Sequence, residues 1–266
     1  VGRGGMGLVF RGFDTELHRV VALKTLAIHL VPIANARARF VREGSACASL
    51  MHPHIVPVHD VITEGPVPAL VMQFVAGPTL DQWLQDRGPL SPQHAVNLMM
   101  QLTEALISAH EKGFVHRDIK PGNVLLEAAG SRALLSDFGL VRTLDDATLT
   151  RSGMLAGTPD FMSPEQARGE TVDARSDLFS LGSLFYTMLS GKAPFSAEEP
   201  MAVMNRICHE KQSPVSSIVP NIPPAVEKLT VRLLQKAPSK RVSCAGELFE
   251  RLRSLKAELR DSTELT

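Results

Sequence analysis

The stretch HRDIKPGNVLL, residues 116–126, decides how the rest of the chain is interpreted. Its first eight residues include an imidazole, a guanidinium, a carboxylate, an ammonium and an amide, and the stretch then turns apolar. The proline and the glycine inside it restrict the shapes that its backbone adopts. A polar surface loop is the ordinary explanation of such a stretch, so its meaning depends on the surrounding sequence.

Length and charge set the first limits. The 266 residues allow one large domain or two lobes with a substantial core. The 28 basic residues balance the 28 acidic residues, so no overall positive field points to nucleic acid or to an anionic membrane. The most apolar run, LFSLGSLFYTMLSG at 178–191, is too short to span a bilayer and is expected to form a buried helix.

The number and spacing of the cysteines indicate whether the chain belongs to a reducing or an oxidising cellular compartment. Cys47, Cys208 and Cys244 form no C-x-x-C pair, which argues against a disulfide framework and favours a reducing compartment. The chain does not begin with a basic leader followed by an apolar run, so we expect no signal peptide. We therefore expect a cytoplasmic domain, which a longer parent protein could still anchor to a membrane.

The sequence changes from mostly strand-like runs to mostly helical patterns along the chain. The first 75 residues contain one helix-like segment, about 33–50, in which Phe40, Glu43 and Cys47 share a face. Later segments have helical spacing, beginning with 91–113, where Ser91 is the predicted N-cap. We therefore expect a small β-rich lobe followed by a larger helical lobe. The strand-like runs are 7–13, 19–28, 55–62 and 68–75, and the later helical patterns are 174–190, 224–236 and 245–259.

A glycine-rich loop opens the chain. Gly2, Gly4 and Gly7 have the spacing G-x-G-x-x-G. A dinucleotide-binding fold would need a strand before this loop and a helix after it, whereas here a strand-like run follows. A strand-turn-strand flap over phosphates fits better, with a plain hairpin turn as the alternative.

Lys24 is the next candidate. It ends the run VALK, seventeen residues after Gly7, where an ammonium can bridge the phosphates of a nucleotide under the flap. Such a lysine needs a carboxylate to hold it in place, and Glu43 on the predicted helix is the candidate. A surface lysine is the alternative.

Taken together in this order, the motifs resemble those of the protein kinase superfamily, and most closely those of the bacterial, eukaryotic-like Ser/Thr protein kinases. The resemblance implies an α+β, two-lobed kinase fold occupying residues 1–266 as one catalytic domain. Its N-lobe would cover about 1–75, its hinge about 73–78 and its C-lobe about 79–266. The matching stretches are GRGGMG, VALK, Glu43, HRDIKPGN, DFG, GTPDFMSPEQARG, SDLFSLG and Arg241.

The resemblance implies transfer of the γ-phosphate of ATP to protein Ser or Thr hydroxyls. Asp118 would accept the proton of the acceptor hydroxyl group or orient that group for in-line attack, and Lys120 would neutralise the γ-phosphate. Asn123 and Asp137 would supply oxygen ligands to Mg²⁺, with Mn²⁺ as an alternative ion. Lys24, paired with Glu43, completes the implied catalytic set.

The same resemblance assigns a nucleotide cleft and a stack between the lobes. Met72 would be the gatekeeper and Gln73 to Val75 the hinge segment. The apolar stack would consist of Cys47, Val58, His116 and Phe138. The residues implied to bind ATP are Gly2, Gly4, Gly7, Val9, Ala22, Lys24, Met72, Gln73, Val75 and Leu125.

The long segment 137–165 lacks clear periodicity, and such length in a compact domain is usually functional. The resemblance implies that phosphate on Thr150 or Ser152, with Thr148 in reserve, docks on Arg117 and Arg142 and orders the segment. The alternative is that these hydroxyls are solvated loop residues. Relatives often activate in trans as dimers, so the implied partners are protein substrates and a homodimer.

The resemblance also implies which residues select the acceptor hydroxyl and which residues stabilise the helical lobe. Lys120 and Thr158 match the Ser/Thr-specific pattern, with Thr158 bridging Asp118 and Lys120. Glu165 would pair with Arg241 in the helical lobe. Asp177 would hold the backbone of the catalytic loop.

The chain departs from the pattern in two places. It begins at the glycine flap, so most of the first strand is missing and a neighbouring strand edge is expected to be exposed. Ala237 and Val242 stand where relatives often have Asp and Pro. Arg241 is retained, so this second departure is expected to affect stability only modestly.

Three competing functions remain. One is a catalytically weak or dead ATP-binding scaffold, and another is a small-molecule kinase of the aminoglycoside type. The third is a zinc protein built on His52, His54 and His59. Lys24, Asp118 and Asp137 are all present, which argues against the scaffold, and Lys120 with GTPDFMSPEQARG argues against the small-molecule kinase.

Overall fold

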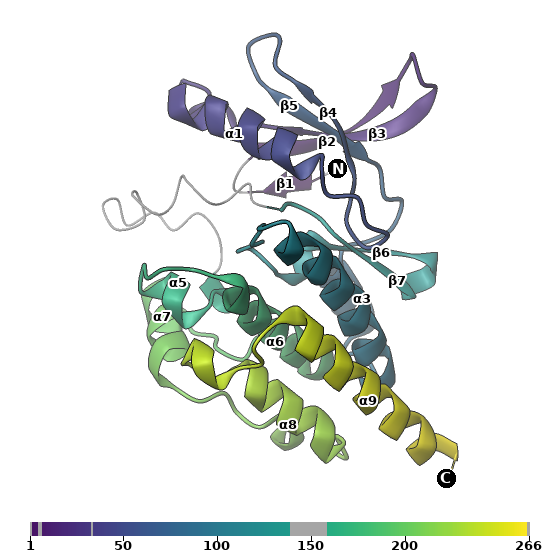
Figure 1. Ribbon diagram of the computed structural model, residues 1–266, viewed down its shortest axis with the longest axis vertical. Helices are drawn as coiled ribbons and strands as arrows, with labels where there is room; N and C mark the ends of the chain where they lie inside the picture. The colour runs from purple at the N-terminus through teal and green to yellow at the C-terminus, as the bar shows by residue number, and fades with distance from the viewer. Residues whose placement is uncertain (1, 5–6, 33, 139–158, 265–266) are drawn as a thin grey trace.

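The computed structural model describes residues 2–4, 7–32, 34–138 and 159–264, and Figure 1 shows a sheet-rich part above a helical part. The sheet has the antiparallel order β1-β2-β3-β5-β4. One helix, α1 (Ala34–Cys47), packs against it. This arrangement confirms the expected α+β, two-lobed fold. The strands are β1 (Gly2–Gly4), β2 (Gly7–Asp14), β3 (Arg19–Thr25), β4 (Val58–Ile62) and β5 (Ala69–Gln73).

The strands of the predicted glycine flap are present as an antiparallel pair. Gly2 of β1 pairs with Val9 of β2, and Gly4 pairs with Gly7. Gly7 has φ +155°, and a Cβ placed there would lie 1.7 Å from the Thr25 carbonyl oxygen. Only glycine therefore lets the flap backbone approach β3 this closely.

Strand β4 begins later than the sequence pattern suggests. The predicted run 55–62 contains Pro57, which has no N–H for a sheet ladder, so β4 starts at Val58. The residues before it pair elsewhere: Ile55 forms a parallel bridge with Leu135, and the Val56 N–H donates to the Leu135 carbonyl at 3.0 Å. This segment therefore joins the sheet lobe to a hairpin of the helical lobe.

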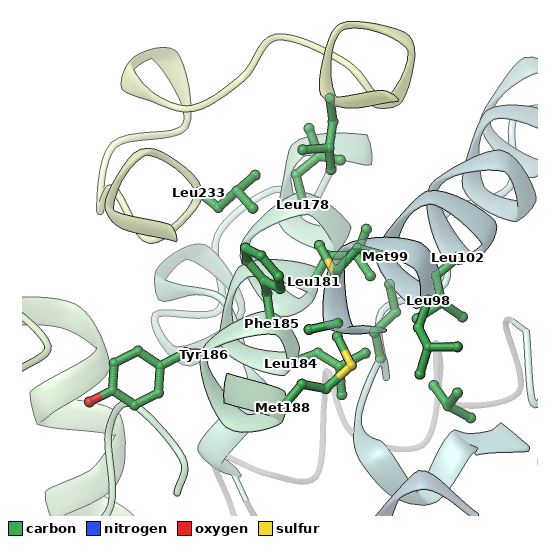
Figure 2. Packing of buried hydrophobic residues seen from close by; sticks show 14 of the residues in the cluster. Leu98, Met99, Leu102, Leu178, Leu181, Leu184, Phe185, Tyr186, Met188 and Leu233 are labelled. Atoms are coloured by element: carbon green, nitrogen blue, oxygen red, sulfur yellow. The ribbon is translucent and has the colours of Figure 1, made fainter. Parts of the chain in front are cut away.

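The helical lobe is organised around α6 (Ala174–Ser190). Every residue of α6 from Ser176 to Ser190 is buried, as expected for a helix that is apolar on most of its surface. Figure 2 shows its leucines and Phe185 packed against Leu98, Met99 and Leu102 of α3 and against Leu233 of α8. The other α-helices of the described residues are α2 (Leu80–Arg87), α3 (Pro92–Glu111), α5 (Pro164–Ala167), α7 (Pro200–His209), α8 (Pro224–Leu233) and α9 (Ala245–Glu264).

Several predicted boundaries need correction. The helix predicted at 33–50 ends at Cys47, and the strand predicted at 19–28 ends at Thr25. The sequence pattern missed α2, α7 and the hairpin of β6 (Val124–Glu127) and β7 (Arg132–Leu135). Strands of four residues are too short to show periodicity, and this explains why the hairpin was missed.

The connection between the lobes depends on Gly77. A Cβ there would lie 1.6 Å from the Leu126 carbonyl oxygen, at the place where the Leu126 N–H donates to the Pro78 carbonyl at 2.9 Å.

We expect Gly77→Ala to lower the free energy of unfolding by about 1–3 kcal/mol, because backbone on both sides has to move apart. The matched control is Gly246→Ala in α9, where the nearest atom to the new Cβ is 3.8 Å away. Urea unfolding should show loss only for Gly77→Ala, and equal midpoints for the two variants would contradict the argument.

Candidate active site

The predicted catalytic loop, residues 116–123, is held by hydrogen bonds to the buried carboxylate of Asp177. Its two oxygens accept the backbone N–H groups of His116 and Arg117, both at 2.8 Å. Arg117 has φ +68°, an unfavourable value for a residue with a side chain, so the loop needs such support. Asp177 therefore makes the contacts with the loop backbone that its predicted role requires. The sequence analysis did not identify His110, whose Nε2 also lies 2.8 Å from Asp177.

His116 connects this loop to the DFG segment. Its Nδ1 accepts the N–H of Asp118 at 3.2 Å, and its Nε2 lies 2.9 Å from the Ser136 carbonyl. These partners fix the neutral tautomer with the proton on Nε2, since a carbonyl accepts and an N–H donates. The ring centroid lies 4.5 Å from that of Phe138.

Asp118, Lys120 and Asn123 form one polar cluster. The Lys120 ammonium lies 2.7 and 2.9 Å from the two carboxylate oxygens of Asp118. The Asn123 amide nitrogen donates to the Asp118 backbone carbonyl at 2.7 Å and to its carboxylate at 2.9 Å. The carboxylate is therefore fixed in orientation while it stays about a quarter exposed, at 27%. A fixed, accessible carboxylate is suited to accept a proton from a bound hydroxyl group.

Asp137 lies beside this cluster because of the β6–β7 hairpin. Val124 pairs with Leu135, and the Ser136 N–H donates to the Asn123 carbonyl at 2.9 Å, so Asn123 and Asp137 lie at the same end of the hairpin. Asp137 itself has φ +67°. This strained backbone at a functional residue fits a side chain held in position for binding.

Lys24 reaches Asp137 across the cleft. The buried Lys24 ammonium lies 2.7 Å from Asp137 Oδ1. Burial raises the pKa of Asp137, but the charge and hydrogen bond of Lys24 outweigh it and lower that pKa overall. Asp137 therefore stays ionised, as a metal ligand must. The predicted pairing of Lys24 with Glu43 stays a prediction.

These residues fit a Mg²⁺ ion held together with phosphates. Asp137 supplies an ionised carboxylate, and Asn123 uses its amide nitrogen for Asp118, so its amide oxygen is its remaining metal donor. Mg²⁺ is commonly held by one or two carboxylates with substrate phosphates completing its shell. Among the residues that the structure describes, no group of three or more His, Cys, Asp or Glu side chains could hold a metal alone.

The residues predicted to line a nucleotide cleft come from both lobes. Ala22 of β3 and Leu125 of β6 pack on the same apolar cluster, which contains Met72 and Val75. Val9 of β2 lies opposite Lys24 in the strand register, and Val21 lies opposite Gln73. Of the residues expected to contact an adenine ring, Ala22, Met72 and Leu125 are thus brought together in one cluster, and Val9 lies on the neighbouring strand.

Residues 1–251 match the protein kinase domain family. The chain belongs to this family. It is 39% identical, over 93% of its length, to probable serine/threonine-protein kinase SCO3848 of Streptomyces coelicolor, of which it covers 38%. It is 37% identical to serine/threonine-protein kinase PknB of Mycolicibacterium smegmatis and 35% identical to PknB of Mycobacterium tuberculosis, covering 93% of its own length and 40% of each relative. The chain thus spans about two fifths of the length of these curated relatives.

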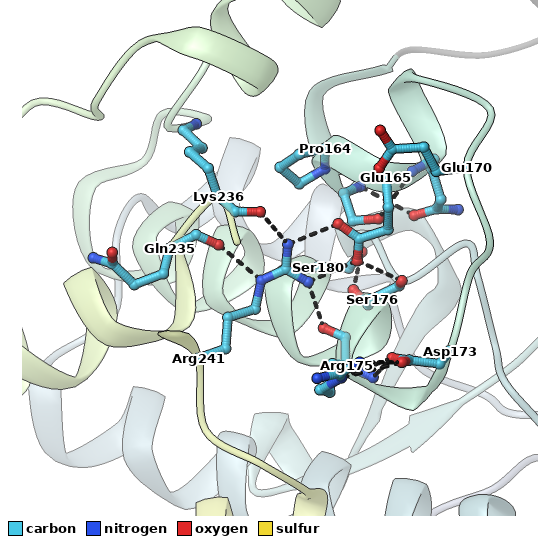
Figure 3. Close-up of polar contacts among 12 residues, drawn as sticks. Pro164, Glu165, Glu170, Asp173, Arg175, Ser176, Ser180, Gln235, Lys236 and Arg241 are labelled. Atoms are coloured by element: carbon cyan, nitrogen blue, oxygen red, sulfur yellow. Dashed lines mark hydrogen bonds and ion pairs between the residues drawn. The ribbon is translucent and has the colours of Figure 1, made fainter. Parts of the chain in front are cut away.

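The predicted ion pair of this kinase domain is present. The buried Arg241 guanidinium meets Glu165 with two contacts of 2.7 Å (Figure 3). Its remaining N–H groups donate to three backbone carbonyls, those of Arg175, Gln235 and Lys236, so all five are satisfied. Burial raises the pKa of Glu165, but hydrogen bonds from Arg241 and Ser176 lower it overall.

Gln166 is a kinase-domain residue that the sequence analysis missed. It forms a reciprocal capping box with Ser163 at the start of α5, and its amide nitrogen donates to the Arg117 carbonyl at 2.7 Å. The spacing S-P-E-Q at 163–166 is the signal that could have revealed the cap. The contact with the catalytic loop had no sequence signal, because 49 residues separate Gln166 from Arg117.

Other predicted positions have different outcomes. Thr148, Thr150, Ser152, Arg142 and Thr158 lie outside the described residues. The zinc alternative gains no support from the contacts of its central histidine. His54 Nδ1 lies 2.8 Å from the Ala133 carbonyl, and its Nε2 lies 3.7 Å from Glu104.

Cys47 has the structural place that the kinase resemblance implies. Its thiol donates to the Phe138 carbonyl at 3.0 Å and so joins α1 to the DFG segment. Burial, followed by the charges of Glu43 and Asp137, raises the pKa of Cys47 to about 12.

We therefore expect Cys47 to resist alkylation in the folded domain. At pH 8 a thiol with a pKa of about 12 is thiolate in about one molecule in 10⁴. Treatment with iodoacetamide followed by mass spectrometry should label the exposed Cys244 and spare Cys47. Both should be labelled in urea. Equal labelling of the two cysteines in the folded protein would contradict this expectation.

Proposed function

We propose that this chain is the catalytic domain of a Ser/Thr protein kinase that transfers the γ-phosphate of ATP to protein hydroxyls. The observation that carries the proposal is the cluster of Asp118, Lys120 and Asn123 beside the Lys24–Asp137 pair. Phosphoryl transfer needs positioned charges more than covalent chemistry, and this cluster supplies positioned charges.

Each residue has a distinct part in the proposed reaction. Asp118 orients the acceptor hydroxyl and accepts its proton, with its carboxylate held by Asn123. Lys120 offsets charge on the transferring group. Lys24 would contact phosphate oxygens of the bound nucleotide, and Asp137 would then be available to hold the metal. Mg²⁺, held by Asp137 and Asn123, would neutralise phosphate charge when bound.

The activation step is a further part of this proposal. Thr150 or Ser152, with Thr148 in reserve, would accept the γ-phosphate of ATP that is bound to a second copy of the chain, which keeps the ADP. Arg117 and Arg142 would then bind that phosphate. A homodimer is the proposed form in which this transfer in trans occurs.

A cytoplasmic location is also proposed. The free cysteines Cys47, Cys208 and Cys244 suit a reducing compartment. Within the described ranges, every helix is too short or too polar to cross a bilayer.

An acceptor assay tests the proposed class. The purified chain is incubated with labelled Mg-ATP and either a Ser/Thr peptide or the same peptide with tyrosine at the acceptor position. Phosphate should appear on the Ser/Thr peptide alone, and mass spectrometry should find it on Thr150, Ser152 or Thr148 of the chain. Transfer to tyrosine, or ATP binding without transfer to either peptide, would reject the proposed class. An unchanged rate in Thr150→Ala with Ser152→Ala would reject only the activation step.

A further inference from the structure

A groove between α8 and α9 lies outside the proposed reaction. It encloses about 740 Å³, and α8 and α9 supply most of its walls. The helices pack against different neighbours, α8 against α6 and α9 against α3, which leaves room between them. In Figure 1 both lie in the part of the helical lobe that faces away from the sheet.

The floor of this α8–α9 groove is apolar. Leu229 of α8 and Leu255 of α9 line it from opposite sides, and each is less than a tenth exposed. Val231, on the same wall as Leu229, is 37% exposed. The groove therefore offers apolar contact area to a partner that reaches down between the helices.

The rim of the groove is strongly basic. Lys228, Arg232, Lys240 and Arg251 line it together with a single carboxylate, that of Glu258. The chain as a whole carries 28 basic and 28 acidic residues, so this is a local concentration of positive charge. Such a rim attracts and orients an acidic partner.

Three of these cations have no partner within the described part of the chain. Arg251 pairs with Glu247 at 2.8 Å, but the side chains of Lys228, Arg232 and Lys240 make neither an ion pair nor a hydrogen bond there. Lys228 and Arg232 are four residues apart on α8, so they lie on one face about a turn from each other. A row of free cations beside an apolar floor is the pattern of a surface that binds an amphipathic segment.

We propose that the α8–α9 groove is a docking site for an acidic protein segment with apolar anchor residues. Carboxylates of the segment would meet Lys228, Arg232 and Lys240, and its apolar side chains would cover Leu229 and Leu255. α8 has ten residues, so the groove accommodates a helical segment about 15 Å long.

The shape of the groove favours a protein segment over other anions. A membrane surface would meet the rim but would leave the floor, formed by buried leucines, uncovered. The lining has no aromatic side chain on which a nucleic acid base could stack. The partner chemistry that uses both the rim and the floor is an acidic, partly apolar peptide.

Fluorescence anisotropy with the whole chain tests this proposal directly. The probe is a labelled peptide of about ten residues, with glutamates on one helical face and leucines at i, i+4 spacing on the other. One comparison peptide has Gln for every Glu, and another has Ser for every Leu. We expect the acidic, leucine-bearing peptide to bind and both comparison peptides to bind about tenfold more weakly.

Charge reversal locates the binding site. Lys228→Glu with Arg232→Glu should weaken binding about tenfold. The matched control, Lys192→Glu with Lys211→Glu, makes the same charge change at exposed lysines outside the groove and should leave binding unchanged. Thermal unfolding checks that both proteins are folded, and Lys240→Glu alone should give a smaller loss in the same direction.

Four results would overturn the proposal. They are absence of binding, equal loss in both double variants, equal binding of the leucine and serine peptides, and binding that is confined to phosphatidylglycerol vesicles. None of these measurements requires phosphoryl transfer. Failure here is therefore distinguishable from failure of the proposed kinase activity.

Discussion

Asp118→Asn is expected to lower kcat for phosphoryl transfer by about 10²–10⁴-fold, with little change in nucleotide affinity. The substitution keeps the size of the side chain and its neighbours Lys120 and Asn123, but it removes the carboxylate that is proposed to accept the proton. Nucleotide affinity should persist because the Lys24–Asp137 pair and the apolar cleft are untouched.

The measurement compares steady-state kinetics with nucleotide binding in the same preparations. Asp86→Asn provides the matched control, since Asp86 is an exposed carboxylate on α2 that undergoes the same chemical change. It should retain full activity. A kcat for Asp118→Asn within about threefold of the native value would exclude a general-base role, which is worth at least about 10²-fold.

Arg241→Met is expected to lower the free energy of unfolding by about 3–5 kcal/mol. Among the described residues, the change leaves the Glu165 carboxylate, which is 3% exposed, with the Ser176 hydroxyl at 2.6 Å as its one remaining side-chain donor. It also leaves three backbone carbonyls without their guanidinium donor. Urea unfolding at pH 7 measures the loss, with Arg253→Met in the exposed pair with Glu250 as the control, expected to cost at most about 1 kcal/mol.

A double variant separates the ion pair from the carbonyl contacts. Glu165→Leu with Arg241→Met removes both charges, and replacing a buried pair by apolar groups is often neutral. Here we expect only partial recovery, because the carbonyls of Gln235 and Lys236 lose their guanidinium donor, and an unpaired buried polar group costs about 1–3 kcal/mol. Full recovery would show that those carbonyls contribute nothing.

The same pair predicts a pH dependence. The pKa of Glu165 is lower in the folded state than in the unfolded chain, so its contribution to stability is complete above the unfolded pKa. That contribution is lost as the pH falls through the folded pKa. Glu165→Gln should therefore reduce the acid sensitivity of unfolding, and an unchanged pH profile would contradict the assignment.

The sequence predicted those features whose signal is local or carried by motif order. α6 was predictable because its apolar residues continue over the whole helix, and the glycine flap because Gly7 precedes a strand-like run. The Glu165–Arg241 pair followed from the family resemblance and is present. The protein kinase family itself was identified from eight stretches in order.

Contacts between distant residues were less predictable. Lys24 and Asp137 are 113 residues apart, and their 2.7 Å contact follows from the closure of the two lobes rather than from any local pattern. The late start of β4 was missed because the run 55–62 is apolar throughout its first four residues, although Pro57 excludes a regular ladder there.

The bridge between Ile55 and Leu135 bears on how the two lobes move. The loop before β4 is tied to the helical lobe at several points. The Lys112 ammonium donates to the Ser49 carbonyl at 2.6 Å, and the Arg132 guanidinium donates to the Pro53 carbonyl at 2.7 Å. Residues 49–56 are therefore mechanically part of the helical lobe although they lie among the strands in sequence.

Opening and closing of the cleft then has two pivots. One is the hinge near Gly77, and the other is the short step from Val56 to Val58, where Pro57 interrupts the ladder. We expect the sheet to move about the line joining these points, with the end of α1 held close to the helical lobe by the hydrogen bond from the Cys47 thiol to the Phe138 carbonyl.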